Sequence, residues 1–371
     1  MHNLPRRQSG LSLIELMIAM AIGLIILAGM VSIFASSSQS HNELEKASRQ
    51  IENGRYAIEM LREEIELAGF YGDYMPISST TWTTPDPCTT ILNDMQFSAA
   101  AVPPSIPSGL YGIDGADALS GNCATILSNR QSGTDILVVR RASTTSIALD
   151  ADADNVLDTP QPITTDEYYL QVSNCADAPA ESAFVMSRIP GDFTLHTVKP
   201  AGAPLSCMNG GLAPARKYVV RLFYIATCNI CSPSDGIPTL KMVELTGGSG
   251  CGNDPSTACG SFTSLPIAEG IENMQLEFGI DNKLQSGVSG ADGSPDAYET
   301  ASAVTTWNDV VSARAFILAR NTEPSMGYTN TKTYVLSSDG SVTVSGGNDH
   351  YRRHAYALTA RANNIAGRRQ Q

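Results

Sequence analysis

The sequence predicts an α+β protein in which one long N-terminal helix packs on an antiparallel β-sheet head. Three observations predict this class. An apolar run, Leu11–Ala35, stands near the start of the chain, and a periodic apolar stripe follows it with no proline before Pro76. Short β-rich runs separated by turn residues then fill most of the sequence after Phe70.

The apolar run Leu11–Ala35 is long enough to span a bilayer. Its 25 residues contain one charged side chain, Glu15, and no proline. At about 1.5 Å per residue the run exceeds the roughly 30 Å of a bilayer core. Arg6 and Arg7 precede it, and positive charge before a first hydrophobic segment favours a cytoplasmic N-terminus. We therefore predict one membrane pass, with the rest of the chain on the opposite side.

The alternative is a secretory signal peptide, which would leave an exported soluble protein without an anchor. A signal peptide has an apolar core of about 7–15 residues and a small-residue cleavage site. The run here is longer than such a core, although Ala35-Ser36-Ser37 offers small residues at its end.

Residues 36–70 predict a continuation of the same helix. Apolar residues recur every seven positions, at Leu44, Ile51, Ile58 and Ile65, and would form one apolar stripe on an otherwise charged helix. Anchor and extension are predicted to form one helix from Leu11 to Ala68, roughly 85–90 Å long. We favour packing of the stripe on the protein's own sheet, because four repeats barely suffice for a coiled coil. Gly69 and Gly72 are the predicted stop signals.

β-Branched and aromatic residues dominate the later runs. Residues 75–133 are rich in Ser, Thr, Pro and Gly, and we predict short elements there at most. The predicted strands cover residues 135–141, 167–172, 183–189, 217–227, 240–245, 271–280, 310–318, 332–336 and 354–361. The predicted organisation is a leader at 1–10, a transmembrane helix at 11–35, a helix extension at 36–70 and a disulfide-containing β-rich head at 71–371.

Charge and motif content argue against two classes of function. The chain has 24 Lys and Arg residues against 37 Asp and Glu residues, a net charge of −13. A nucleic-acid-binding protein needs a basic surface, so we expect no nucleic acid partner. The five histidines lie in no hydrolase or metalloprotease pattern, and no phosphate-binding loop occurs. We therefore predict that the protein is not an enzyme.

The residues around Glu15 carry a resemblance to a known family. Gly10 stands five residues before Glu15, after a short basic leader and directly before the apolar run. This combination resembles the class III signal of type IV pilins, which a prepilin peptidase cuts after the glycine and methylates at the new terminus. The resemblance implies a cut between Gly10 and Leu11 and a role for Glu15 in subunit docking. Leu11 departs from the phenylalanine of most members.

Three later segments resemble the PilW-type minor pilins of type IV pili. They are residues 266–281, 307–314 and 351–353, reading PIAEGIENMQLEFGID, WNDVVSAR and YRR. The resemblance implies a type IV pilin-like fold and a subunit that helps to prime pilus assembly. The implied partners are other minor pilins and the major pilin through the N-terminal helix, the prepilin peptidase and the inner-membrane assembly platform. The implied location is the bacterial inner membrane with a periplasmic head, then the pilus filament or its tip at the cell surface.

Two alternatives to the priming role stay open. A J-type minor pseudopilin of type II secretion shares the anchor and the size range. A pilus-tip adhesin or ligand-binding module would use residues 75–216, which are long, loop-rich and outside the resemblance.

The cysteines all lie in the predicted exported part, where an even number indicates disulfides. The eight residues are Cys88, Cys123, Cys175, Cys207, Cys228, Cys231, Cys251 and Cys259. Proximity favours the pairs Cys88–Cys123, Cys175–Cys207 and Cys251–Cys259, but sequence alone does not choose among the pairings. The C-x-x-C spacing of Cys228 and Cys231 also occurs in zinc and redox sites. We favour a disulfide there, because no second pair has zinc-knuckle spacing.

Two acidic loops are candidate calcium sites. The first places carboxylates at positions 1, 3, 5 and 9 of an EF-hand-like loop, at Asp150, Asp152, Asp154 and Asp158. Its positions 6 and 12 hold Asn155 and Gln161, where a calcium loop needs glycine and glutamate. The second loop combines Asp281, Asp292 and Asp296. We favour solvated turns for both loops, with weak calcium binding as the alternative and no other cofactor.

Overall fold

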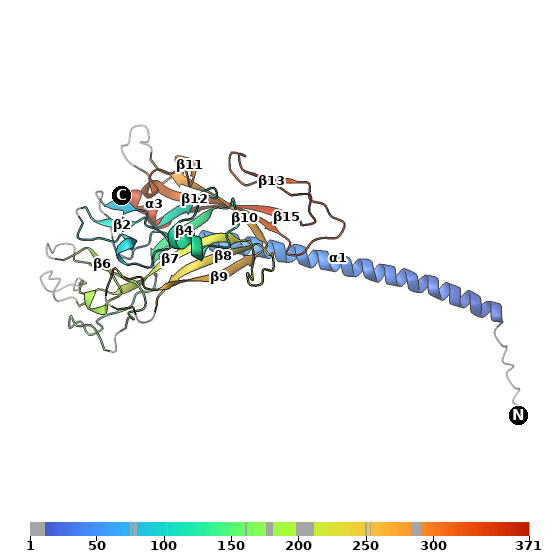
Figure 1. Cartoon of the computed structure of the whole chain (residues 1–371), viewed down its shortest axis with the longest axis horizontal. Coiled ribbons are helices and arrows are strands. Elements are labelled where there is room, and N and C mark those ends of the chain that lie inside the picture. The colour runs from blue at the N-terminus through green and yellow to red at the C-terminus, as the bar shows by residue number, and fades with distance from the viewer. Residues whose placement is uncertain are drawn as a thin grey trace, which may run out of the picture. The chain divides into compact units, whose positions relative to one another are not determined.

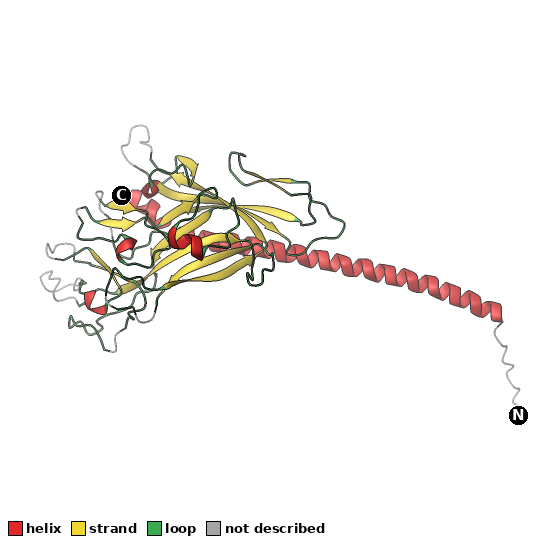
Figure 2. Ribbon diagram, viewed as in Figure 1, coloured by secondary structure: helices red, strands yellow, loops and turns green. Residues whose placement is uncertain are grey.

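The chain has the predicted α+β architecture, a long N-terminal helix followed by antiparallel sheets (Figure 2). The structure is a computed structural model that describes residues 12–74, 76, 80–101, 103–159, 162–175, 181–197, 211–248, 251–252, 254–282 and 291–370. Two compact units divide the chain, residues 1–49 and residues 50–371. Helix α1 (Leu13–Leu67) contributes residues to both. The division into leader, transmembrane helix, extension and head stays a prediction.

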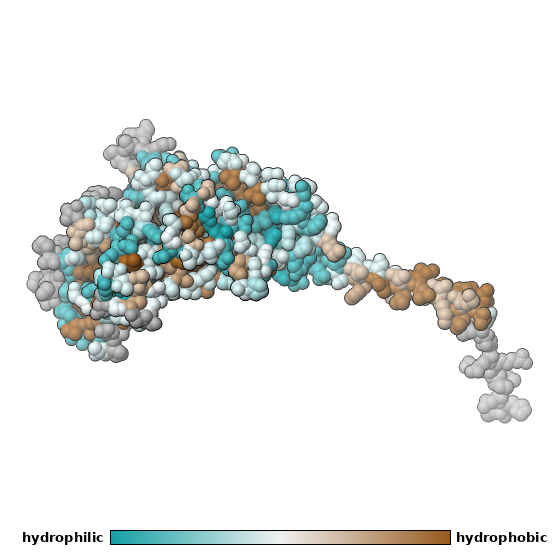
Figure 3. Space-filling view, in the orientation of Figure 1, coloured by the Kyte–Doolittle hydropathy of each residue, from teal (hydrophilic) through white to brown (hydrophobic). Residues whose placement is uncertain are grey.

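The first unit contains the apolar half of α1. Every residue from Ser12 to Asn42 is exposed, and the apolar ones colour this stretch of helix brown in Figure 3. Length and composition allow this helix to cross a membrane, with a mean hydropathy of 2.6 over its most apolar window. Exposed apolar side chains on all sides of a helix are typical of a membrane span, so this half of α1 fits a membrane anchor.

The second unit is built on two sheets (Figure 1). The larger contains, in order, β3 (Leu110–Ile113), β4 (Ile136–Ala142), β7 (Ala215–Ala226), β5 (Tyr169–Val172) and β6 (Phe184–Ser187), with β8 (Thr239–Thr246) paired to β7 and β9 (Ser261–Glu269) to β8. The smaller contains β11 (Ala297–Thr300), β10 (Ile271–Ile280), β12 (Val310–Arg320) and β15 (Arg353–Arg361). All neighbours within both sheets are antiparallel.

Short elements complete the second unit. They are the parallel pair β1 (Thr81–Thr83) and β2 (Ser105–Pro107), the hairpin of β13 (Thr333–Val335) and β14 (Thr343–Ser345), helix α2 (Gly121–Ile126), helix α3 (Asn363–Arg369) and the 3₁₀ turns Asn93–Met95, Pro190–Asp192 and Trp307–Asp309. The region 75–133 therefore has the short elements that its composition predicts.

Alternation along the strands places a separate core on each face of the larger sheet. On β7, Phe223 and Ile225 belong to the first core, whereas Leu222 and Tyr224 belong to the second. The first core also contains buried side chains of α1 and of the smaller sheet, namely Ala57, Leu61, Ile65, Met274, Leu276, Phe278 and Ile317. The last turns of α1 therefore pack in a core that both sheets share.

The seven-residue stripe of α1 divides between buried and exposed positions. Ile65 is fully buried and Ile58 is partly buried, whereas Ile51 is 49% exposed. Leu44, in the first unit, is 69% exposed. Packing on the protein's own sheet, the favoured interpretation, is thus correct for the second half of the stripe and wrong for the first.

Polar contacts join the beginning of the buried part of α1 to the sheets. The Gln50 side chain donates to the carbonyl of Ala319 at 2.7 Å and to that of Arg352 at 3.1 Å. Asn53 donates to the carbonyl of Glu269 at 3.0 Å. These contacts hold α1 at its entry into the head, about four turns before the helix ends.

Two glycines meet at the end of α1. Gly69 has a φ of 71°, the left-handed conformation of a helix stop signal, as predicted. Its N–H donates to the carbonyl of Arg140 at 2.9 Å, and the N–H of Arg140 donates to the carbonyl of Gly109 at 2.8 Å. A Cβ on Gly109 would overlap the backbone of Gly69. The helix end therefore needs glycine at both positions.

We expect Gly109→Ala to reduce the free energy of unfolding by about 1–3 kcal/mol, because the atoms that the new Cβ would meet belong to the backbone of Ala68 and Gly69 and cannot rotate away. Chemical denaturation of the full chain in detergent micelles would measure it. Gly191→Ala is the control, since a Cβ there meets no atom within 4 Å. If Gly109→Ala is as stable as wild type, the close contact between Gly109 and the backbone of Gly69 is refuted.

Candidate functional site

Glu15 caps the N-terminus of α1. Its Oε2 accepts the N–H of Ser12 at 2.9 Å, and serine three residues before glutamate is the spacing of a capping box. A carboxylate in the first turn also interacts favourably with the helix dipole. The S-x-x-E spacing of Ser12 and Glu15 signals this local role, which was not among the predictions from the sequence. Within the described part of the chain, no cation pairs with this exposed carboxylate.

Gly10 and Leu11, the predicted cleavage and methylation positions, lie outside the described residues. The structure therefore describes the helix that follows the predicted cut and not the cut itself. Processing at this position stays a prediction from the sequence.

In the first acidic loop, carboxylate oxygens of Asp150, Asp152 and Asp158 lie within 4.8 Å of one another. Asp150 accepts backbone N–H groups of Asp154, Asn155 and Leu212 at 2.9–3.0 Å. Partial burial raises the pKa of Asp150, but these hydrogen bonds outweigh it and hold that pKa below its usual value. The loop is thus held together by its own backbone donors.

Asp154 is not part of this cluster. Its carboxylate accepts the N–H of Val156 at 2.8 Å. A hydrogen bond with Asp150 and the charge of Asp154 raise the pKa of Asp152. Gln161, the twelfth loop position, lies outside the described residues. Calcium binding here stays a prediction.

Asp281 of the second acidic loop is part of an ion pair. It is 1% exposed, and its Oδ2 accepts from the N–H of Gly293 at 2.8 Å and from Nε of Arg369 at 3.1 Å. Asp292 and Asp296 accept local backbone N–H groups. Among the described residues these three carboxylates do not converge on one point. An arginine thus already neutralises Asp281, and calcium binding at this loop stays a prediction.

Three disulfides join described cysteines, namely Cys88–Cys123, Cys228–Cys231 and Cys251–Cys259. The first and third are pairs that proximity favours. Cys175 is also disulfide-bonded, while its predicted partner, Cys207, lies outside the described residues. Asp86 lies beside the first pair, but the disulfide engages both sulfurs, so this group is not a metal site.

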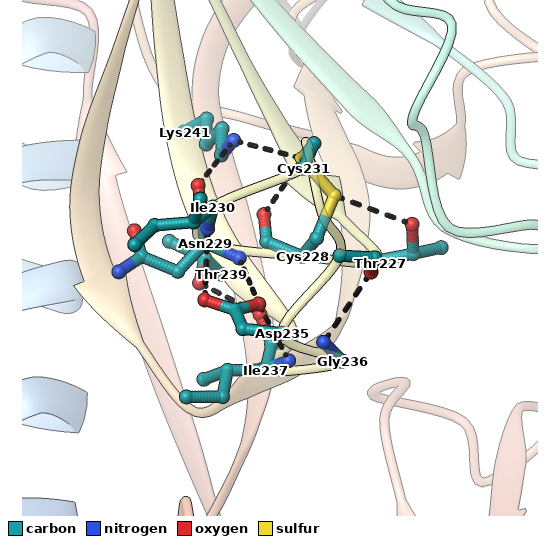
Figure 4. The surroundings of a disulfide bond; sticks show 11 residues. Thr227, Cys228, Asn229, Ile230, Cys231, Asp235, Gly236, Ile237, Thr239 and Lys241 are labelled. Atoms are coloured by element: carbon teal, nitrogen blue, oxygen red, sulfur yellow. Dashed lines mark hydrogen bonds between the residues drawn. A yellow bond between two sulfur atoms is a disulfide. The ribbon is translucent and has the colours of Figure 1, made fainter.

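Figure 4 shows the loop that the Cys228–Cys231 disulfide closes after β7. The Asp235 carboxylate accepts the backbone N–H groups of Asn229, Ile230 and Ile237 at 2.8–3.0 Å. Lys241 donates to the carbonyl of Asn229 at 2.9 Å. Both sulfurs are bonded to each other, and backbone groups of the turn are hydrogen-bonded to the side chains of Asp235 and Lys241. The C-x-x-C segment is therefore a disulfide-closed turn and not a zinc knuckle.

The segments 266–281 and 307–314 form one packed unit. Gly270 turns the chain from β9 into β10 with a φ of 77°, and a Cβ there would collide with the carbonyl of Arg320. Trp307 packs edge-on against Phe278, with ring centroids 4.9 Å apart. These residues therefore position the two longest strands of the smaller sheet.

The third segment, 351–353, joins this unit through Arg353. Its guanidinium binds Glu272 of β10 and also Asp349, the latter at 2.6 Å. Arg353 has a side chain that is 6% exposed. The ion pair with Glu272 links β15 to β10 across the intervening strand, β12.

Comparison with protein families gives two matches. The family model of the Type IV Pilus-assembly protein W matches residues 222–364, and that of the Prokaryotic N-terminal methylation motif matches residues 5–31. The first match covers the whole smaller sheet and part of the larger one, and the second covers the region around Gly10 and Glu15. A comparison with curated proteins returned no match, and neither did a comparison with solved structures.

Proposed function

We propose that this protein primes pilus assembly as a processed subunit. The family matches support a PilW-type, type IV pilin-like protein, that is, a minor pilin related to type IV pili. Both families consist of structural pilus components and not of enzymes, and they imply interaction with other pilus components. The observation that carries the proposal is the methylation motif, whose match at residues 5–31 includes much of the exposed apolar half of α1 and that half's single carboxylate, Glu15. That combination suits insertion, processing and lateral packing of helices.

In this proposal the prepilin peptidase removes residues 1–10 and methylates Leu11. The apolar half of α1 stays in the inner membrane with the head in the periplasm, where other minor pilins and the assembly platform meet it. Incorporation then proceeds by packing of α1 against the same helix of other minor pilins and of the major pilin.

Glu15 is the proposed docking residue. A carboxylate inside a membrane helix costs free energy unless a partner satisfies it, about 2.5–3.5 kcal/mol at the helix centre and less near the end of the helix, where Glu15 lies. The hydrogen bond that Glu15 accepts from Ser12 uses part of the acceptor capacity of its carboxylate. The remaining lone pairs can accept the terminal amine of a neighbouring subunit. The amine would then neutralise the charge, which the capping hydrogen bond alone does not do.

The test separates capping from docking. We expect Glu15→Ala and Glu15→Gln both to be inserted and cleaved, and both to support about 10- to 100-fold fewer pili, the effect of losing a hydrogen bond to a charged group. Glutamine keeps the capping-box pattern and loses the charge. Pili would be counted in cells that carry the variant as the sole copy, and cleavage would be followed by the mass of the membrane-bound protein.

Assembly of Glu15→Gln at the wild-type level would refute charge-mediated docking. Gly10→Ala is the processing control and is expected to accumulate with residues 1–10 attached. The N-terminal sequence of the mature protein checks the anchor itself. A methylated Leu11 supports the proposal, whereas a terminus near Ser36 would mean an exported soluble protein.

A further inference from the structure

The two cysteines of the C-x-x-C turn differ in their exposure to solvent. Cys228 is 2% exposed, whereas Cys231 is partly exposed and is followed by a run of exposed residues, 232–236. A thiolate attacks a disulfide at one sulfur and expels the other, so access helps to decide which sulfur is attacked. An external thiol is therefore expected to form its bond with Cys231 and to release Cys228.

A hydroxyl group lies beside the sulfur that would leave. Oγ1 of Thr227 lies 3.7 Å from Sγ of Cys228 and can donate a hydrogen bond to it (Figure 4). A hydrogen bond to the charged form of a group stabilises that form, and a thiol with a lower pKa leaves a disulfide faster. Thr227 would thus stabilise the thiolate of Cys228 once the disulfide opens.

A buried ammonium group lies beside the sulfur that would be attacked. Nζ of Lys241 lies 3.4 Å from Sγ of Cys231 and donates to the carbonyl of Asn229 at 2.9 Å (Figure 4). The carbonyl of Cys228 also lies 3.4 Å from this sulfur. Lys241 is 8% exposed, and burial lowers its pKa although the charge of Asp235 opposes the shift. A thiolate at Cys231 would offset the burial of the ammonium group, which in turn would stabilise the thiolate.

The two other bridges between described cysteines have oxygen atoms beside their sulfurs. In Cys88–Cys123, a carboxylate oxygen of Asp86 lies 3.4 Å from one sulfur. In Cys251–Cys259, the carbonyl oxygen of Gly248 lies 2.6 and 3.6 Å from the two sulfurs. Negative or partly negative oxygens disfavour a thiolate. Of the three described bridges, Cys228–Cys231 is therefore the best suited to thiol exchange.

The turn keeps hydrogen bonds of its own when the disulfide opens. The carboxylate of Asp235 still accepts three backbone N–H groups of the turn. The side chain of Asn229 donates to Glu269 at 2.7 Å, and the carbonyl of Gly236 accepts from Arg320 at 3.2 Å. A disulfide between residues only 3 apart also removes little loop entropy. The opened turn is therefore expected to keep its place in the head.

We propose that Cys228–Cys231 is an exchange-active disulfide that accepts an external thiol at Cys231. The external thiolate forms a bond to Sγ of Cys231, the bond between the two cysteine sulfurs breaks, and its electron pair leaves with Cys228. A second external thiolate then attacks the external sulfur of this mixed disulfide and releases Cys231 as a thiolate beside Lys241. Two external thiols are thereby oxidised to one disulfide, their protons pass to water, and the two cysteines are reduced. The proposal does not depend on the priming role.

The experiment exposes the full chain, in detergent micelles near pH 7.5, to reduced glutathione and traps free thiols with N-ethylmaleimide at successive times. Peptide mass spectrometry shows which disulfide opens and which cysteine holds glutathione. We expect glutathione on Cys231, and opening of Cys228–Cys231 on the order of tenfold faster than opening of Cys251–Cys259, because access and the pKa of the leaving thiol set the rate. Earlier opening of Cys251–Cys259, or glutathione bound to Cys228, would overturn the proposal.

Variants test the two groups beside the sulfurs. Lys241→Met is expected to slow opening about three- to tenfold, because the cation beside Cys231 is lost, whereas Lys241→Arg keeps the charge and most of the rate. Lys217→Met is the control with an unchanged rate, since this lysine pairs with Glu167. Thr227→Val, at an exposed position, is also expected to slow opening. Wild-type rates in both Lys241→Met and Thr227→Val, or in Thr227→Val alone if Lys241→Met does not fold, would overturn the proposal.

A second arm identifies the source of the thiol. Glutathione is replaced by a reduced protein of the thioredoxin class, which carries two thiols. Opening at a lower concentration of this protein than of glutathione assigns the disulfide to exchange with protein dithiols. Opening that needs an equal or higher concentration of the protein assigns it to small thiols.

Discussion

Glu64→Ala is expected to reduce the free energy of unfolding of the head by about 3–5 kcal/mol, the cost of breaking a buried ion pair. Glu64 lies on α1 and is 4% exposed. Its carboxylate binds the guanidinium of Arg221 on β7, and its Oε2 lies 3.5 Å from Nε of Arg141 on β4. Arg221 keeps a second carboxylate, Glu244, at 2.7 Å. Arg141 would lose the carboxylate beside it and stay buried.

Equilibrium denaturation followed by the fluorescence of Trp82 and Trp307, both in the head, would measure this loss. Glu63→Ala is the matched control, because Glu63 is the neighbouring acidic residue on the same helix and is exposed. We expect the control to change stability by less than about 0.5 kcal/mol. A similar loss of unfolding free energy in Glu64→Ala and Glu63→Ala would show that the ion pair of Glu64 does not stabilise the fold.

Replacement of both Cys88 and Cys123 by serine is expected to cost about 3–4 kcal/mol. This disulfide joins residues 35 apart in sequence, and the loop-entropy relation gives that magnitude for a loop of such length. The Cys228–Cys231 disulfide spans a separation of 3, for which the same relation gives about 2 kcal/mol. The measurement is the midpoint of chemical denaturation for each double variant.

We expect the Cys88 and Cys123 variant to lose more unfolding free energy than the Cys228 and Cys231 variant. Cys88→Ser with Cys123→Ser should also make the region 75–133 more sensitive to proteolysis, since the bridge closes this loop-rich segment. Equal destabilisation by the two pairs would contradict the dependence on loop length. A larger loss from the Cys228 and Cys231 variant would contradict it as well.

The strands that are rich in β-branched and aromatic residues could be predicted from the sequence. The runs 217–227 and 271–280 became β7 and β10 with shifts of two residues at most. The strand β9 was not predicted as such, because Ser, Thr and Pro266 interrupt its pattern. Among the described strands β9 pairs only with β8, and an edge strand tolerates a proline that a central strand would not.

The site could be predicted only where its residues are neighbours in sequence. Gly10, Leu11 and Glu15 form a local motif, whereas Asp281 and Arg369 are 88 residues apart and meet through the fold. The sequence therefore showed the carboxylates of the second acidic loop without the arginine that neutralises Asp281. Glu64 and Arg221, separated by 157 residues, escaped notice for the same reason.

The way α1 is held in the head has a mechanical consequence. Gln50 and Asn53 form hydrogen bonds to the sheets where the buried part of α1 begins. Further along, Glu64 forms an ion pair with Arg221, and Gly69, just after the helix, donates a hydrogen bond to Arg140. A force along the helix axis acts on these contacts in parallel, as a shear force. The hydrogen bonds and the ion pair would then have to break together and not one after another. We therefore expect this helix to resist extraction under tension better than a helix that is held at a single point.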